Sequence, residues 1–313
     1  MATSGSTNFQ QTRNEIISDA LQLIGRLGEG ETATANALSF GSNILNKLVK
    51  HLEAQGIHLW TESEGTVFLR DGVSKYTLSS SGDKACDDST LVETELTSAG
   101  SGTTLAVTST TGMTASDVIG IELDDNTRQW ATIVSVDSST GVTITPALTG
   151  AAASGNTVFS YTANVGRILK IIDARCRTSD DNDMSMKVIG RTQYMRITTK
   201  TTQSSPNVLF YSPNRDDGTL YVWPTPDAVS DRIKMSYLRT IQDFDSGSDN
   251  PDLPQEWLHS LTLLTARALA SAYGINLQKV NPDLLQQCVQ ALEELKLWDN
   301  DMGSVFILPE DWD

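Results

Sequence analysis

The sequence is poor in cysteine, in histidine and in recognisable catalytic motifs. Its three cysteines are odd in number and far apart, so they offer neither a disulfide framework nor a CxxC metal site. Its three histidines stand outside any HExxH or Cys/His arrangement. No GxSxG, GxxxxGK[ST] or GxGxxG occurs, which removes the commonest hydrolase and phosphate-loop signatures. The sequence therefore predicts no catalytic residue, no metal site and no cofactor.

Long apolar runs are also missing. No segment approaches the roughly 18 apolar residues of a membrane span, and the first eight residues are small and polar. We expect a protein made in the cytosol and not embedded in a membrane.

Basic side chains are scarce. The 313 residues carry 23 Lys and Arg against 39 Asp and Glu, a formal net charge of -16. Such a surface repels nucleic acid and does not grip its phosphates, although moderate acidity can also serve solubility alone.

Two helices are predicted at the start of the chain. Thr12-Arg13-Asn14-Glu15 reads as a capping box, and an apolar stripe follows it up to Gly28, which can supply a left-handed stop. A second stripe predicts a helix over about residues 34 to 55, and the short connection favours an antiparallel pair.

A β section follows the two helices. The runs 66–69 and 75–78 flank the turn dipeptide Asp71-Gly72, which favours a hairpin. Further strand signals occur between residues 167 and 238. Two more helices are predicted after Asp252 and after Asn281-Pro282.

Residues 91–162 differ in composition from the rest of the β section. They are rich in Thr, Ser, Gly and Val and contain a single basic residue, Arg128. Short alternating runs bounded by turn residues predict an inserted all-β barrel or sandwich of about five strands, with a linker as the alternative. The predicted fold is thus α+β: a core domain of residues 1–90 and 163–313, with a four-helix cluster and a β section, and an inserted β module at 91–162.

Acidic clusters are the remaining candidates for chemistry. They lie in loops and include Asp180, Asp181 and Asp183 as well as Asp243 and Asp245. The first cluster lacks the glycine of an EF-hand loop, so a solvated turn is the favoured interpretation.

Four segments are informative when taken together: 14–25, the end of the second helix at 52–56, Gly218-Thr219-Leu220-Tyr221-Val222-Trp223-Pro224 and 252–257. They resemble the head-to-tail adaptors of short-tailed bacteriophages, specifically the tail accessory factor family of P22-like phages. The resemblance covers about residues 12 to 80 and 165 to 300, while 91–162 departs from the family pattern.

The resemblance implies a structural, non-enzymatic virion protein of the phage neck. Members form a ring, a dodecamer in this family, that binds the portal protein and docks the tail nozzle or tail tube, while double-stranded DNA passes through the channel. An acidic excess suits such a conduit, and the Asp180–Asp183 and Asp243–Asp245 loops are candidates for its surface.

The last apolar segment of the chain is a candidate anchor. We expect Val305, Phe306, Ile307, Leu308 and Trp312 to attach the adaptor to the portal or to a neighbouring subunit, with a frayed terminus as the alternative.

Two alternative functions also fit the sequence. One is a virion-associated peptidoglycan hydrolase with carboxylates such as Glu62 and Glu64 in acid and base roles. The other is a receptor- or glycan-binding tail component, with 91–162 as its binding module.

Overall fold

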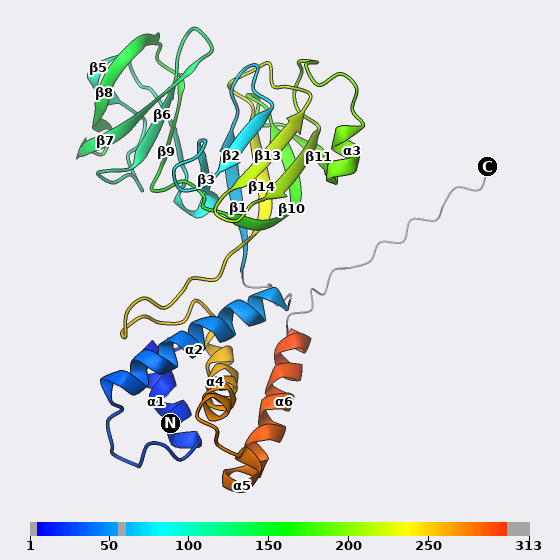
Figure 1. The fold of residues 1–313 in the computed structure, drawn as a ribbon. Coiled ribbons are helices and arrows are strands. Elements are labelled where there is room, and N and C mark those ends of the chain that lie inside the picture. Colours follow the sequence, from blue (N-terminus) through cyan, green and yellow to red (C-terminus); the bar gives the residue numbers. More distant parts are fainter. Residues whose placement is uncertain (1–4, 56–60, 299–313) are drawn as a thin grey trace. The chain divides into compact units, whose positions relative to one another are not determined.

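The computed structural model describes residues 5–55 and 61–298, and the chain divides into two compact units (Figure 1). Unit 1 combines residues 1–61 with 241–313, and unit 2 comprises 62–240. The five proposed anchor residues, Val305 to Leu308 and Trp312, lie outside the described residues.

Unit 1 is helical, and its first helix begins where the sequence predicts. α1 (Arg13–Leu23) starts at Thr12, whose backbone N–H donates to the Glu15 carboxylate at 2.7 Å while the Thr12 hydroxyl caps the Glu15 amide. The helix ends earlier than expected, because Gly25 rather than Gly28 takes the left-handed conformation, at φ +71°. α2 (Ala35–Ala54) follows, capped by Thr34.

The expected cluster of four helices is not matched. Within the described residues unit 1 has five α-helices, which add α4 (Leu258–Ala272), α5 (Leu277–Val280) and α6 (Pro282–Trp298) to the first two. The extra helix α5 arises because Asn276 caps a new turn and Pro282, which lacks an N–H, starts the next helix. A sixth helix, α3 (Arg191–Met195), lies in unit 2.

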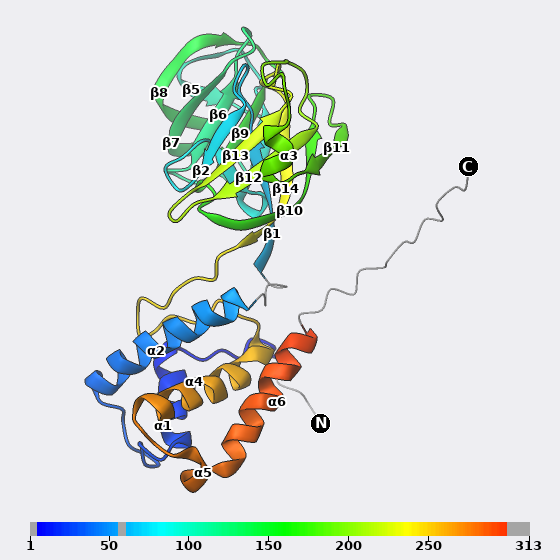
Figure 2. The same cartoon turned by 45° about the vertical axis from the view of Figure 1, so that its right-hand side comes forward.

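The core of unit 1 forms around α4. This helix packs against α1, α2 and α6, and in both views α2 and α6 flank it (Figures 1 and 2). The segment before it also joins the core, with Ile241 and Phe244 buried. The Asn46 side chain accepts from the Phe244 N–H at 3.0 Å and donates to the Phe244 carbonyl at 3.1 Å, so residues 241–244 are held on α2.

Unit 2 contains an eight-stranded sheet whose order is β2-β13-β12-β11-β10-β14-β1-β3. Its strands are β1 (Glu62–Phe68), β2 (Lys75–Leu78), β3 (Ala85–Asp87), β10 (Ile168–Arg177), β11 (Asp183–Val188), β12 (Val208–Pro213), β13 (Gly218–Trp223) and β14 (Arg232–Arg239). All neighbours are antiparallel except β11 and β12. Side chains from all eight strands contribute to one buried cluster, so the sheet curls around its own core.

The predicted hairpin around Asp71-Gly72 is wrong. The turn exists, since the Val73 N–H donates to the Arg70 carbonyl and Gly72 has φ +70°. However, β1 pairs with β14 and β3, whereas β2 pairs with β13. The chain therefore crosses from one end of the sheet to the other at this turn, which local turn chemistry cannot reveal.

A second, six-stranded sheet is formed by β4 (Val92–Glu95), β5 (Gly100–Ala106), β6 (Val118–Glu122), β7 (Arg128–Ser138), β8 (Gly141–Ala152) and β9 (Thr157–Tyr161). Its order is β4-β9-β6-β7-β8-β5, and a bridge between Leu96 and Val107 joins the two ends into a nearly closed barrel. Val92 pairs with Ser160, so the chain enters and leaves the barrel on adjacent strands.

The mixed α+β character is confirmed, but the two units follow a different boundary from the expected domains. The split separates the helices from all of the β structure, and both sheets belong to unit 2. The sheets share an aromatic cluster in which Phe68 and Cys86 of the eight-stranded sheet contact Phe159 and Tyr161 of the barrel. The independence of residues 91–162 stays a prediction.

Candidate functional site

Four cations project from one face of two neighbouring strands in the eight-stranded sheet. Side chains two apart in a strand share a face, which places Arg175 with Arg177 on β10 and Arg232 with Lys234 on β14. The strand register sets Arg175 opposite Lys234 and Arg177 opposite Arg232. Like charges directly opposite each other destabilise a sheet, so this row requires carboxylates beside it.

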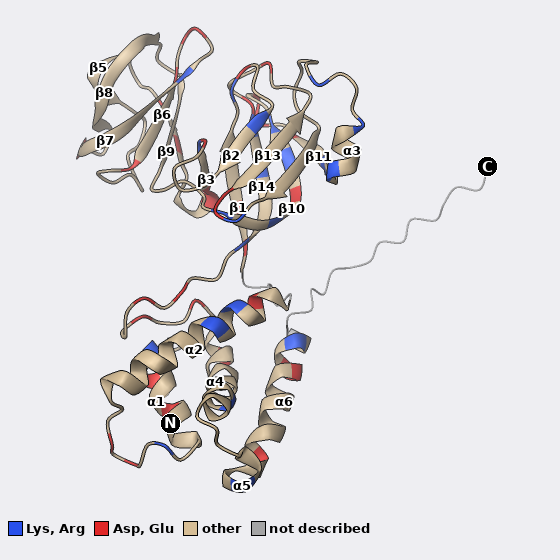
Figure 3. Cartoon of the chain, in the orientation of Figure 1, with Lys and Arg blue, Asp and Glu red and all other residues tan. Residues whose placement is uncertain are grey.

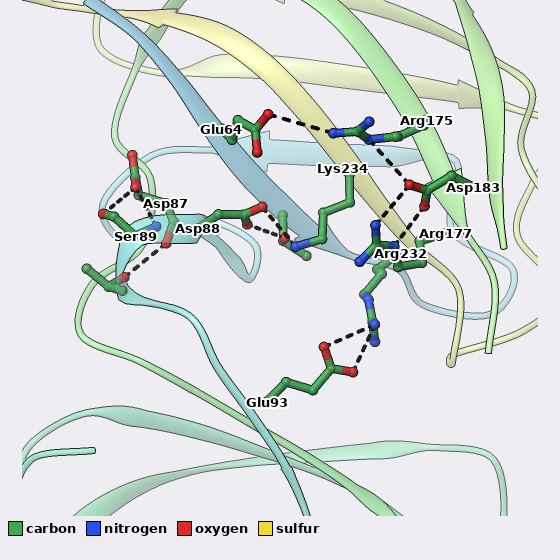
Figure 4. Close-up of polar contacts among 12 residues, drawn as sticks. Glu64, Asp87, Asp88, Ser89, Glu93, Arg175, Arg177, Asp183, Arg232 and Lys234 are labelled. Atoms are coloured by element: carbon green, nitrogen blue, oxygen red, sulfur yellow. Dashed lines mark hydrogen bonds and ion pairs between the residues drawn. The ribbon is translucent and has the colours of Figure 1, made fainter. Parts of the chain in front are cut away.

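Asp183 neutralises the two arginines on β10, Arg175 and Arg177 (Figure 4). Its two carboxylate oxygens accept from Arg177 Nε at 2.7 Å and Nη2 at 2.9 Å, and Arg175 Nε lies 3.6 Å from Oδ2. The hydrogen bonds from Arg177 hold the pKa of the Asp183 carboxyl below its ordinary value. Arg175 also reaches Glu64 on β1, at 3.7 Å.

Lys234 and Asp88 form a more enclosed pair on the same face. Their charged atoms are 2.8 Å apart, and the side chains are 12% and 21% exposed. Thr66 also donates to Asp88. Asp88 follows directly after β3, so this pair connects the central strand β14 to the edge of the sheet (Figure 4).

Arg232 and Arg128 lie where the two sheets of unit 2 meet. Arg232 Nη2 is 2.8 Å from Glu93 and 2.9 Å from Asp181, and Arg128 Nη2 is 2.6 Å from Glu122. Both guanidinium groups lie about 5.0 Å from the centre of the Phe159 ring. The side chains of Arg232 and Arg128 are 5% and 3% exposed, so both charges are buried where the two sheets meet.

The Phe159 ring compensates for hydrogen bonds that Arg128 and Arg232 lack. Arg128 Nε and Arg232 Nε are buried and have no hydrogen-bond partner, while Phe159 offers its π face to both groups. Burial lowers the pKa of Arg128, and the Glu122 carboxylate opposes that change. The cluster therefore fastens the six-stranded barrel to the eight-stranded sheet.

We name Arg175, Arg177, Arg232, Lys234 and their carboxylates Glu64, Asp88, Glu93, Asp181 and Asp183 the charged face. Within it four cations meet five carboxylates, a sum of -1. All four cations belong to the eight-stranded sheet. The six-stranded barrel itself has hardly any Lys or Arg (Figure 3). The arrangement supplies paired charges.

The structure separates the acidic residues singled out from the sequence. Asp181 and Asp183 belong to the charged face, and Asp180 lies exposed beside them. Asp243 and Asp245 are in unit 1, where Asp243 pairs with Lys50 at 3.0 Å and the Asp245 N–H donates to Asp249. Asp181, Asp183 and Asp243 thus each have a cationic partner.

The sequence analysis did not identify the four cations of the charged face as site residues. The signal available was the repeat of basic residues two apart, in Arg175-Cys176-Arg177 directly after one predicted strand and in Arg232-Ile233-Lys234 inside another. Their meeting depends on the pairing of β10 with β14, which are distant in sequence.

The geometry gives little support to a hydrolase built on Glu62 and Glu64. The two lie in one strand, Glu64 is 63% exposed and it pairs with Arg175. Glycoside hydrolysis needs two carboxyl groups that face each other across the substrate. Among residues 5–55 and 61–298 there is also no group of three or more His, Cys, Asp or Glu placed to hold a metal ion. No helix in these residues is long and apolar enough to span a bilayer.

A family model, described as SU10 adaptor protein, matches residues 123–305, more than half of the chain. The chain belongs to the SU10 adaptor family. It is therefore a bacteriophage adaptor, a structural protein, as the resemblance in its sequence implied at the level of adaptors in general.

The match extends from the six-stranded barrel of the adaptor to its last helix. It includes β7, β8 and β9, so part of the barrel belongs to the family pattern, although residues 91–162 were expected to depart from an adaptor pattern. A search of the curated proteins returns no match.

Among solved structures, VP17, a capsid protein of bacteriophage P23-77, is 12% identical to the adaptor. The alignment covers 61% of this chain and 77% of that chain with a TM-score of 0.13, a value that carries no structural argument.

Proposed function

We propose that this adaptor forms a closed ring beneath the phage portal, extends the DNA channel and provides the docking site for the tail. The observation that carries the proposal is the adaptor-family match over residues 123–305. The chain then acts in the neck of the virion without a catalytic step. Its partners are the portal protein, a tail nozzle or tail tube protein, and further copies of itself.

The finer features follow the P22-like resemblance. They are a dodecameric ring, a short-tailed phage, and attachment through Val305 to Leu308 and Trp312 to the portal or the neighbouring subunit. A ring interface is heterologous and must close on itself, so one subunit type can build the whole wall.

DNA is proposed to pass through the ring without sequence-specific binding. The net charge of -16 supports this, as do the Asp180–Asp183 and Asp243–Asp245 loops as candidate channel surfaces. Within the charged face the cations are already paired, so a DNA phosphate would have to displace a carboxylate to bind there.

The six-stranded barrel is proposed to be an inserted module on the outside of the ring. The adjacency of its first and last strands, where Val92 pairs with Ser160, supports insertion into a pre-existing fold.

Incubation of the full-length chain with purified portals, followed by sedimentation, tests the proposal. We expect the chain to cosediment with portals, and a truncation that lacks residues 304–313 to lose binding. Failure of the full-length chain to bind would refute portal attachment, and undiminished binding by the truncation would refute the C-terminal anchor.

A further inference from the structure

An apolar groove runs between three helices of unit 1. Leu48 and Leu52 of α2, Leu264 and Ala268 of α4 and Leu292 of α6 line it, and its volume is about 390 Å³. α4 packs against both α2 and α6, so the groove lies within one packed helical core. An apolar cavity of roughly 150 Å³ holds a benzene-sized group, so at least two large side chains fit here.

The rim of the groove is positively charged. Arg267 lines it on α4 and forms no ion pair with any of residues 5–55 and 61–298. His51 and Gln55 of α2 complete the rim and bond to each other. A segment that fits this groove has large apolar side chains followed by carboxylates.

The chain itself contains such a segment shortly after α6. Val305-Phe306-Ile307-Leu308 are four consecutive large apolar residues, and Glu310 and Asp311 follow them. We propose that Val305 to Leu308 of the same chain occupy the groove in the free subunit, with Glu310 and Asp311 near Arg267.

The reach of the chain permits this binding. At 1.5 Å rise per residue, α6 extends only about 9 Å beyond Leu292. The six residues 299–304 can span up to about 20 Å when extended, which is enough to turn back to the groove. Tethering also gives the segment a high effective concentration at its own groove, which favours it over a second copy.

The inference goes beyond the proposed function, because it concerns the free subunit before any partner is present. Burial of these apolar side chains removes them from water, so the free subunit does not expose an apolar patch that would promote aggregation.

Cysteine crosslinking in the full-length chain tests the proposal. Ile307→Cys is combined with Ala268→Cys inside the groove or, in a second variant, with Ser271→Cys at its exposed rim. The matched control combines Ile307→Cys with Gln290→Cys, an exposed position of α6. The three native cysteines are buried.

We expect a disulfide within one chain, formed about an order of magnitude faster at both groove positions than at the control position. Mass measurement separates crosslinked monomers from dimers. Crosslinks found only between two chains would overturn the proposal in favour of a second copy, and groove rates equal to the control rate would show that the segment does not bind the groove.

Discussion

At the scale of single residues, the two enclosed arginines distinguish structural charges from surface charges. Arg128 is 3% exposed and bonds to Glu122 and to the Val229 carbonyl, whereas Arg177 is 29% exposed and bonds to Asp183. Removing one member of a buried pair leaves an uncompensated charge, while exposed pairs contribute little.

Arg128→Met is therefore expected to lower the free energy of unfolding by about 3 kcal/mol. The matched change in an exposed pair, Arg177→Met, should cost about 1 kcal/mol or less. Urea unfolding of the full-length chain measures both. Equal losses in the two variants would contradict the assignment of Arg128 as the fastening charge.

The Asp183 carboxyl predicts a pH dependence. Its pKa is lowered in the folded state by Arg177, so its contribution to stability is present above the unfolded pKa of about 3.9 and is lost as the pH falls through the folded pKa. The difference in urea midpoint between wild type and Asp183→Asn should be present at pH 7 and shrink near pH 2. Asp180→Asn is the control, because Asp180 is exposed and forms no ion pair with any residue of 5–55 or 61–298. A difference that stays constant with pH would contradict this cause.

At the scale of elements, local sequence signals predicted where helices and strands form better than they predicted which strands pair with each other. The capping box at Thr12 and the apolar stripes located α1, α2 and α4, and the turn-bounded runs located most strands. The hairpin at Asp71-Gly72 failed, because strand partners are chosen by long-range packing that a turn dipeptide does not encode. The charged face could not be predicted for the same reason, since it exists only once β10 pairs with β14.

The contact between α1 and α2 depends on a glycine. A Cβ at Gly41 would lie 2.5 Å from Ile17 Cγ2, inside the buried core. Gly41→Ala gains up to about 1 kcal/mol of helix propensity, yet overpacking costs about 1–3 kcal/mol, so we expect a net loss of stability. Asn43→Ala, at an exposed position of α2, should be neutral or slightly stabilising in the same unfolding assay. A stabilised Gly41→Ala variant would show that the two helices are not closely packed.

The six-stranded barrel offers a further element-scale test. A short Gly-Ser linker in place of residues 91–162 can join the adjacent chain ends, but it exposes Phe68 and Cys86, which now contact Phe159 and Tyr161. We expect the deletion to retain ring assembly only when Phe68→Thr is added to restore solubility. Circular dichroism and assembly on portals report the outcome. Loss of the eight-stranded sheet in both versions would show that the barrel is part of the core.

At the scale of the whole molecule, the proposed role is that of one subunit in the wall of a DNA channel. The family match, the acidic excess and the paired cations of the charged face are consistent with a wall along which DNA slides.

Assembly of this wall is expected to require the portal as a template. The free chain should be monomeric or weakly associated, since a heterologous interface must close into a ring. Native mass measurement of the purified chain checks this expectation, and stable dodecamers without portal would contradict it.

Electron cryo-microscopy of the neck of the phage particle shows whether this adaptor forms the proposed ring beneath the portal. We expect a closed ring directly below the portal into which both units of this chain fit, with the channel for DNA at its centre. A neck in which no density between portal and tail fits the chain would contradict it.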